Sequence, residues 1–484
     1  MSNNQSVLKI SKKAFIQSAL IILALIITAG LLSQAIPSGS FETTISDGRS
    51  VIVPGSFRYT EAPPYPVWRW FTAPVEVLWG PDAAVIITII VVLLLIGGAF
   101  ALLEKAGVLK AVIARVVLRM GDRKYLLMAV VILCFMLFGA LLGIFEEFII
   151  LVPVMIALAY LLGWDAMTGL GMSLLAVAFG FSAALANPFT IGIAQRLAEL
   201  PVFSGLGLRA LVFITIYGIL CFFLIRYAKK IEKEPSLSPV YEEDASLRSR
   251  FSLTREELTA QANPRLKSAL TWFLASLATI IVISIAAAFN SAISGFALPL
   301  IGLIFLLGGV GAALLSGMKL KEAASVFGST VAGISPAIIL ILMAVSVKHI
   351  MTNAQVMDTI LDYAVRTIGH ASPYGASLMV YGLVLFLNFF IGSASAKAFL
   401  VIPIIAPLVD LVGLTRQTAV LAFAFGDGFS NVLFPTNAAL LIGLGLAGVS
   451  YLKWFKWVIL LQLLVLIVTT LFVLLAVAIN YGPF

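Results

Sequence analysis

Long apolar runs recur along the whole chain, and they constrain its fold more than any other feature. Stretches of roughly 18 or more apolar residues, each long enough to cross a hydrocarbon core of about 30 Å, follow one another from Ala14 onward. The sequence is 61% hydrophobic and 11% charged, with a mean hydropathy of +1.09. Soluble domains usually carry about 25% charged residues. The sequence therefore predicts a polytopic membrane protein embedded in a lipid bilayer.

The basic residues lie beside the apolar runs, as they do in the cytoplasmic loops of membrane proteins. Lys9, Lys12 and Lys13 precede the first run, Ala14–Leu32, which predicts a cytoplasmic N-terminus and a first transmembrane helix. The net charge of +8 is not gathered in one stripe or arm, so no nucleic-acid partner is expected. Cys134 and Cys221 lie in apolar segments without metal-like spacing.

Two apolar runs are interrupted by polar residues, glycine and proline. The first run, 125–162, contains Glu146, Glu147 and Pro153, and the second, 374–412, contains Lys397. Irregular backbone at membrane depth is tolerated only where protein or a water-filled cavity surrounds it. We therefore expect a re-entrant hairpin in each run, the first entering from the cytoplasm and the second from outside. A broken span is expected to follow each hairpin.

The second interrupted run repeats the first. The alignment places Leu151-Val152-Pro153 on Val401-Ile402-Pro403 and Gly163 on Gly413, with Glu146-Glu147 opposite Ala396-Lys397. Further on, Asn187-Pro188 is predicted to correspond, with a small gap, to Phe434-Pro435. One extra span between the halves, Ala269–Ala288, would invert the second repeat. Inverted repeats with broken helices at the membrane midplane are typical of secondary transporters.

The expected architecture is all-α, with about nine full transmembrane helices and two opposed hairpins. A surface loop at 37–81, an amphipathic interfacial helix at Ala106–Met120, a span at 330–347 and an interfacial stretch at 348–370 complete it. The predicted organisation has five parts: scaffold helices, external loop and interfacial helix at 1–124; the first repeat core at 125–228; a cytoplasmic linker at 229–267; connecting and scaffold helices at 268–373; and the second repeat core at 374–484.

Candidate substrate-binding residues are the polar side chains where the repeats break, because a charge at bilayer depth needs a partner or a cavity. They are Glu146, Glu147, Ser182, Asn187, Thr190, Ser393, Ser395, Lys397, Asp427, Asn431, Thr436 and Asn437. The carboxylates of Glu146, Glu147 and Asp427 outnumber the single lysine. Protons, sodium or a cationic substrate group could balance the excess, and the sequence does not choose among them. No metal site and no organic cofactor are expected.

Familiar nucleotide-binding, metal-binding and catalytic patterns give no evidence of such functions here. Gly443–Gly448 fits G-x-G-x-x-G but lies in an apolar helix without a preceding strand, which favours helix packing over nucleotide binding. His349 and His370 are too far apart for a helical metal pair. The protease, ATPase and hydrolase motifs H-E-x-x-H, G-K-S/T and G-x-S-x-G are missing, so an enzyme is not expected.

Four stretches in the repeat cores resemble a known family: Phe145–Phe148, Gly163–Gly169, Ala186–Gln195 and Phe425–Asn431. Their sequences, F-E-E-F, G-W-D-A-M-T-G, A-N-P-F-T-I-G-I-A-Q and F-G-D-G-F-S-N, are similar to the YfcC-type branch of the C4-dicarboxylate uptake C and arginine/ornithine antiporter-related carriers. The resemblance extends over most of the chain. At the hairpin tips this chain has Phe-Glu-Glu and Ser-Ala-Lys where sodium–dicarboxylate relatives have Ser-Asn-Thr.

The resemblance implies the ion-transporter superfamily fold: a homodimer in which a transport part moves as an elevator past a scaffold. It also implies a bacterial inner membrane. Substrates in the wider family include dicarboxylates, short-chain fatty acids and basic amino acids. The expected function is secondary active transport of an amino acid, a basic one favoured, or a similar small organic ion. The alternatives are a sodium- or proton-coupled carrier of dicarboxylates or short-chain carboxylates, and, in another class, an ion channel.

Overall fold

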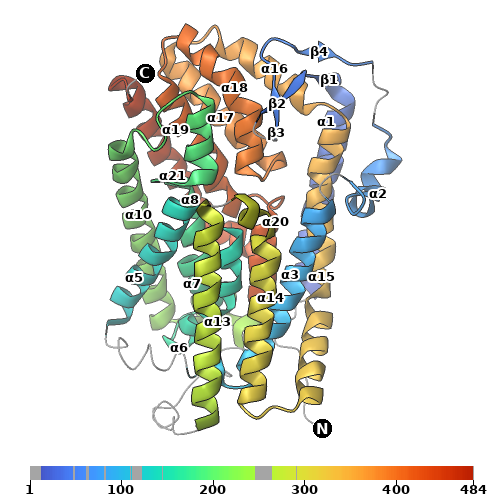
Figure 1. Cartoon of the computed structure of the whole chain (residues 1–484), viewed down its shortest axis with the longest axis vertical. Coiled ribbons are helices and arrows are strands. Elements are labelled where there is room, and N and C mark those ends of the chain that lie inside the picture. Colours follow the sequence, from blue (N-terminus) through green and yellow to red (C-terminus); the bar gives the residue numbers. More distant parts are fainter. Residues whose placement is uncertain are drawn as a thin grey trace.

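The computed structural model shows a bundle of helices (Figure 1). It describes residues 12–46, 49–61, 65–80, 83–109, 111, 123–143, 145–245, 264–289 and 291–482. In this part of the chain, ten helical stretches are long and apolar enough to span a membrane, which confirms the predicted polytopic all-α class. These lie in α1 (Lys12–Ala35), α3 (Ala83–Lys105), α5 (Lys124–Leu137) with its π-helical extension, α10 (Leu206–Lys233), α13 (Pro264–Phe289), α14 (Ser291–Leu315), α15 (Leu320–Asn353), α17 (Pro373–Phe390), α18 (Ala394–Leu411) and α21 (Tyr451–Ala478).

Helices α1, α3, α13, α14 and α15 form one group, which extends from the centre (α13, α14) to the right (α1, α3, α15) of Figure 1. In this group α13 packs on α14, α14 on α3, and α15 on both α1 and α3. Helix α15 extends from Leu320 to Asn353, well beyond the predicted span of 330–347, with Pro336 inside it. The polar residues at both ends continue the helix instead of ending it. The predicted interfacial stretch is correspondingly shorter, with α16 at Met357–Ile368.

The first repeat begins with α5 and the π-helix Phe138–Leu142, and it returns through the 3-10 turn Glu146–Leu151 and α6 (Val152–Leu161). Next come α7 (Ala166–Leu170), the π-helix Gly171–Leu175 and α8 (Ala176–Ser182). The backbone then leaves the helix at the predicted position. The π-helix Pro188–Gly192 and α9 (Ile193–Leu197) complete the broken helix, and α10 follows.

The second repeat has the same order of elements. Helices α17 and α18 correspond to the pair formed by α5 and α6, and α19 (Arg416–Gly428) corresponds to α7 and α8. The 3-10 turn Phe429–Val432 and the residues after it interrupt the helix before α20 (Ala438–Ala447), and α21 ends the repeat. Internal duplication therefore extends to the level of individual helices.

The two repeats have opposite directions, as two contacts at the ends of α10 and α21 show. Tyr481, just after α21, donates a hydrogen bond to the carbonyl of Gly205, just before α10. At the other end, Lys453 in the first turn of α21 pairs with Glu243, which follows α10. The last helices of the repeats are therefore antiparallel. In Figure 1, α6 and α7 lie towards the lower end, whereas α18 and α19 lie towards the upper end.

The predicted surface loop at 37–81 contains regular structure. Strands β1 (Gly39–Ser40) and β4 (Arg58–Tyr59) pair antiparallel, as do β2 (Thr43–Ser46) and β3 (Arg49–Ile52). The short helix α2 (Trp68–Glu76) follows and packs against α15. These elements lie at the upper right in Figure 1. Of the predicted interfacial helix Ala106–Met120, most lies outside the described residues.

The beginning of the predicted linker is folded against the bundle, which the sequence did not indicate. Asp165, the N-cap of α7, accepts hydrogen bonds from the hydroxyls of Tyr227 (2.5 Å) and Ser238 (2.7 Å). Asp244 accepts one from the backbone N–H of Ala166 at 2.9 Å. The segment 235–244 thus provides hydrogen-bond partners at the start of α7, where backbone N–H groups have no partner within the helix. Residues 246–263 of the linker lie outside the described part.

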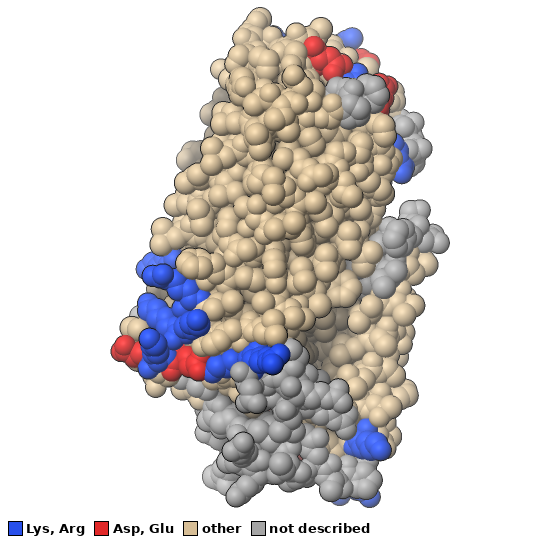
Figure 2. Space-filling view, turned by 90° about the vertical axis from the view of Figure 1, so that its left-hand side faces the viewer, with Lys and Arg blue, Asp and Glu red and all other residues tan. Residues whose placement is uncertain are grey.

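Lysines and arginines gather at the lower end of the molecule (Figure 2). Above them on this face extends a broad surface almost without charge, as a lipid-facing belt requires. Helix α10 ends in this region, and its last two turns contain Arg226, Lys229, Lys230 and Lys233.

Candidate functional site

Asn187 and Asn437 occupy equivalent places where the two broken helices restart. The Oδ1 atom of Asn187 accepts hydrogen bonds from the backbone N–H groups of Phe189 (2.9 Å) and Thr190 (3.2 Å). That of Asn437 accepts one from Leu440 N at 3.1 Å. Each asparagine is the N-cap of the second half-helix, and caps of this kind satisfy N–H groups that lack a helical partner.

This equivalence corrects the predicted alignment. Asn187 and Asn437 are 250 positions apart, the same separation as Gly163 and Gly413, so the repeats correspond here without a gap. The pairing of Asn187-Pro188 with Phe434-Pro435 was wrong because it matched the prolines and not the helix caps. Pro188 starts its half-helix, whereas Pro435 lies in the turn that precedes Asn437.

A buried ion pair joins the second hairpin to the second broken helix. Lys397 Nζ lies 2.6 Å from Asp427 Oδ1, and both side chains are 0% exposed. The ammonium also donates to Asn388 Oδ1. Among the described residues, no other charged group contacts the carboxylate of Asp427, so Lys397 is its partner. Each charge would cost about 2.5–3.5 kcal/mol at the bilayer centre, so the pair is strongly interdependent.

Asn388 connects this ion pair to the break in the second helix. Its amide Nδ2 donates to Ser430 Oγ at 2.7 Å and to Asn431 Oδ1 at 2.9 Å. Asn431 Oδ1 also accepts from Asn437 Nδ2 at 3.3 Å. The network brings together the predicted residues Lys397, Asp427, Asn431 and Asn437. Sequence reasoning missed Asn388, because nothing along the chain links a lone asparagine in an apolar run to these partners.

The tip of the second hairpin also contacts both breaks. Ser393 is the N-cap of α18, and Ser395 Oγ donates to the carbonyl of Phe189 in the first repeat at 3.2 Å. Thr436 Oγ1 donates to the carbonyl of Phe389 at 2.5 Å. These three predicted residues thus hold hairpin and half-helices together.

In the first repeat, Ser182, Asn187 and Thr190 surround the break. Ser182 Oγ donates to the carbonyl of Ala178 at 2.7 Å, and the buried hydroxyl of Thr190 has no hydrogen-bond partner among the described residues. At the first hairpin tip, Gly143 has a φ of +66°, and a Cβ there would lie 2.2 Å from Asn187 Oδ1. The turn and the close approach both require glycine.

Glu146 begins the 3-10 turn Glu146–Leu151 of the first repeat. It is exposed and lines a recess with Ile89 of α3, Leu298 of α14 and Ala439 of α20, where the first hairpin meets the other group of helices. The side chain of Glu147 lies outside the described atoms. Helix α20, whose N-cap is Asn437, borders both this recess and the break in the second helix.

A buried polar cluster at the upper end was also missed. Arg209, 3% exposed, donates to the carbonyls of Leu185 (2.9 Å) and Phe203 (3.0 Å) and so ties the first break to the loop before α10. The amides of Gln195 and Gln417 meet beside Ser204. Arg209 was not singled out, because its carbonyl partners carry no signal in the sequence.

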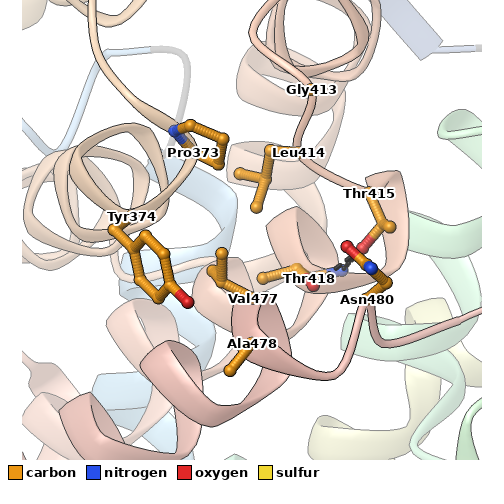
Figure 3. A pocket seen from close by; sticks show the side chains of 9 residues that line it. All are labelled: Pro373, Tyr374, Gly413, Leu414, Thr415, Thr418, Val477, Ala478 and Asn480. Atoms are coloured by element: carbon orange, nitrogen blue, oxygen red, sulfur yellow. Dashed lines mark hydrogen bonds between the residues drawn. The ribbon is translucent and has the colours of Figure 1, made fainter.

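Another recess lies at the upper end, between the start of α17, the turn before α19 and the end of α21 (Figure 3). Thr415 and Thr418 line it, with their hydroxyls 2.7 Å apart, and Tyr374 and Asn480 face the same space. None of the residues that line it is charged. The charged centre between the broken helices is therefore the better candidate for binding an organic ion.

Inverted repeats, broken helices and a buried charged centre together define a membrane transporter. The chain belongs to the C4-dicarboxylate anaerobic carrier family, whose model matches residues 15–478. It is 29% identical over 480 residues to the putative basic amino acid antiporter YfcC of Escherichia coli, covering 90% of this chain and 91% of that protein. It is 27% identical over 371 residues to an uncharacterized protein of Haemophilus influenzae, covering 75% of this chain and 70% of that one.

Among solved structures, the chain is similar to the YdaH transporter of Alcanivorax borkumensis, with a TM-score of 0.44 and 17% identity over 97% of this chain and all of that one. It is also similar to MtrF of Neisseria gonorrhoeae, with a TM-score of 0.40 and 17% identity over 95% of this chain and 94% of that one.

Proposed function

We propose that the protein is a secondary active transporter of an amino acid, a basic one favoured, or of a similar small organic ion. The observation that carries this proposal is the Lys397–Asp427 pair, fully buried where two broken helices and a hairpin meet. Helix ends and unwound backbone at such a junction offer carbonyls and N–H groups to a substrate and its coupling ion. The name of the relative YfcC supports the choice of a basic amino acid.

The proposed movement is that of an elevator. The two repeats would form the transport part, with α5–α6 and α17–α18 as re-entrant hairpins that enter from opposite sides. Helices α1, α3, α13, α14 and α15 would form the scaffold and the contact between two copies in a homodimer. The basic lower end in Figure 2 would face the cytoplasm of a bacterial inner membrane. Sodium or a proton would serve as the coupling ion.

In this proposal the predicted residues keep their assigned places. Asp427 and Lys397 provide the charged centre. The neutral hydrogen bonds come from Asn187, Thr190, Ser395, Asn431, Thr436 and Asn437. Glu146 and Glu147 carry charge at the first hairpin tip, beside the scaffold. If Glu147→Gln and Asp427→Asn both left uptake and binding intact in liposomes, this assignment of the site would be wrong.

Thermal stabilisation of the detergent-purified protein tests the substrate class. Amino acids, dicarboxylates and short-chain acids are each added with and without sodium, at two pH values. A ligand that binds only the folded state stabilises it by RT ln(1 + [L]/Kd), about 2.7 kcal/mol at a hundredfold excess over Kd. Stabilisation by arginine or ornithine supports the proposal. Stabilisation only by dicarboxylates with sodium would support the second candidate, which the family's description favours.

A further inference from the structure

Each charge of the Lys397–Asp427 pair lies at the unfavourable end of its own helix. Lys397 is in the first turn of α18, Ala394–Leu411, where the helix dipole is positive and repels a cation. Asp427 is in the last turn of α19, Arg416–Gly428, where the dipole is negative and repels an anion. Neither helix end stabilises its own charge, so each of the two groups depends on the other.

The end of α19 has the chemistry of a cation site. It combines the Asp427 carboxylate with the negative end of a helix, and no donor of the described residues meets hydrogen-bond geometry at either carboxylate oxygen. Oxygen-rich helix C-termini of this kind coordinate cations in transporters with broken helices. In the structure the ammonium of Lys397 fills this place, at 2.6 Å from Asp427 Oδ1.

The ammonium that fills the site is on a flexible tether. Lysine has a four-carbon stem, and its ammonium is a compact charge with rotatable donors. Lys397 belongs to the hairpin, whereas Asp427 belongs to the broken helix, so a change in the packing of the two elements separates the charges. A cation that arrives at Asp427 then takes the position of a similar group that is already part of the chain.

We propose that Lys397 is a tethered competitor for the cationic group of the cargo, and that binding exchanges its ammonium for the cargo's ammonium or guanidinium on Asp427. This inference rests on the proposed transport function and assigns the cationic part of the cargo to Asp427. It gives Lys397 the role of occupying the empty site, and not of contacting the cargo. The exchange keeps the Asp427 carboxylate paired before and after binding.

A tethered competitor has a distinctive effect on affinity. When a site is open for only a fraction of the time, the apparent Kd equals the intrinsic Kd divided by that fraction. If Lys397 covers Asp427 for more than about 90% of the time, removing its charge tightens binding about tenfold or more. Removing a residue that contacts the cargo would have the opposite effect.

The experiment measures the Kd of L-arginine and of L-ornithine on the detergent-purified full chain by calorimetry. Lys397→Gln is expected to tighten the Kd at least tenfold, and adding Asp427→Asn to that variant is expected to abolish the gain. Lys105→Gln removes a half-exposed cation that pairs with Glu322 at 2.8 Å, and it serves as the matched control with unchanged Kd. Weaker or unchanged binding by folded Lys397→Gln overturns the inference.

Lys397→Arg keeps the inference testable if Lys397→Gln does not fold. It retains the charge and adds a guanidinium that can pair with a carboxylate through two hydrogen bonds, so it competes more strongly and weakens the Kd. Equal or tighter binding by Lys397→Arg contradicts the inference. Failure of the transport function gives a different result: the wild-type chain neither binds nor takes up any probe. A wild-type chain that transports basic amino acids, with unchanged or weaker binding by Lys397→Gln, overturns the inference alone.

Discussion

The ring of Phe179 packs edge-on against the ring of Phe429, with centroids 5.5 Å apart and planes at 82°. The two residues are 250 positions apart, like Asn187 and Asn437, so equivalent positions of the two repeats touch each other. A contact between equivalent positions places the pseudo-twofold axis of the inverted repeats between these rings. Asp427 lies two residues before Phe429 in the chain. The charged centre is therefore joined directly to the residue that marks this axis.

The Lys397–Asp427 pair gives the first prediction. Either Lys397→Gln or Asp427→Asn leaves a buried charge without a partner and is expected to cost about 3–5 kcal/mol of stability. The double variant is expected to recover most of this loss, because no buried charge is left over. Asp427→Asn alone or in the double variant is expected to abolish transport. Unfolding and uptake measured on all four chains test both statements.

A surface pair provides the control for that cycle. Lys105 and Glu322 form an ion pair of similar length, 2.8 Å, with side chains that are 45% and 46% exposed. Exposed pairs contribute about 0–1 kcal/mol. Lys105→Gln is therefore expected to leave both stability and uptake close to wild type. Equal losses from the buried and the exposed variants would contradict the assignment of the buried pair.

The paired asparagine caps give the second prediction. Asn187→Ala and Asn437→Ala are each expected to cost about 0.5–2 kcal/mol and to lower uptake, because both half-helices restart beside the site. Ser372→Ala removes the N-cap of α17, where Ser372 Oγ accepts from Gly375 N at 3.3 Å away from the breaks. It is expected to cost stability without lowering uptake. If the loss of uptake were proportional to the loss of stability in all three variants, the broken helices would have no specific role in transport.

Close helix contacts in the two repeats give the third prediction. A Cβ at Gly180 of α8 would lie 2.0 Å from the carbonyl oxygen of Met136 in α5, and one at Gly426 of α19 would lie 2.8 Å from that of Tyr381 in α17. Alanine at either position forces the helices apart and is expected to cost about 1–3 kcal/mol. Gly218→Ala in α10 meets nothing within 4 Å and is expected to be neutral or stabilising. Thermal unfolding of the three variants tests this prediction. Equal stability of all three variants would contradict it.

The short helix α2 gives a pH-dependent prediction outside the membrane spans. A hydrogen bond from Arg69 lowers the pKa of Glu76 from 4.5 to about 2, and burial opposes the shift. Because the folded-state pKa is the lower one, the stabilisation is present above about pH 4.5 and is lost as the pH falls towards about 2. The stability difference between the wild type and Glu76→Gln is expected to shrink as the pH falls below about 4.5 towards about 2. A difference that grows on acidification would contradict the prediction.

The sequence predicted those parts of the fold that apolar runs and their interruptions mark. The spans and the break at 182–190 appear where composition placed them, because lipid enforces long apolar runs and the breaks carry polar residues. The length of α15 was underestimated, since its polar ends remain helical. The docking of Asp244 on the start of α7 was missed because its partner is a backbone N–H group 78 positions earlier.

The candidate site was predictable in its charged residues and not in their geometry. Lys397 and Asp427 were identified because charges are rare at membrane depth. Glu146 was grouped with them, and it lines a recess beside α3 and α14, which the sequence did not indicate. Asn388 and Arg209 act through partners that are distant in the sequence or lie in the backbone. Such contacts cannot be predicted from the residue types alone.

Counterflow in proteoliposomes tests the central claim most directly. Uptake of labelled arginine and ornithine is compared between liposomes preloaded with the unlabelled amino acid and empty ones, for the wild type and for Asp427→Asn. A carrier whose site includes Asp427 predicts uptake that preloading accelerates and that Asp427→Asn abolishes. Uptake that preloading does not accelerate would indicate a pore, and undiminished counterflow in Asp427→Asn would contradict the site at the junction of the two repeats.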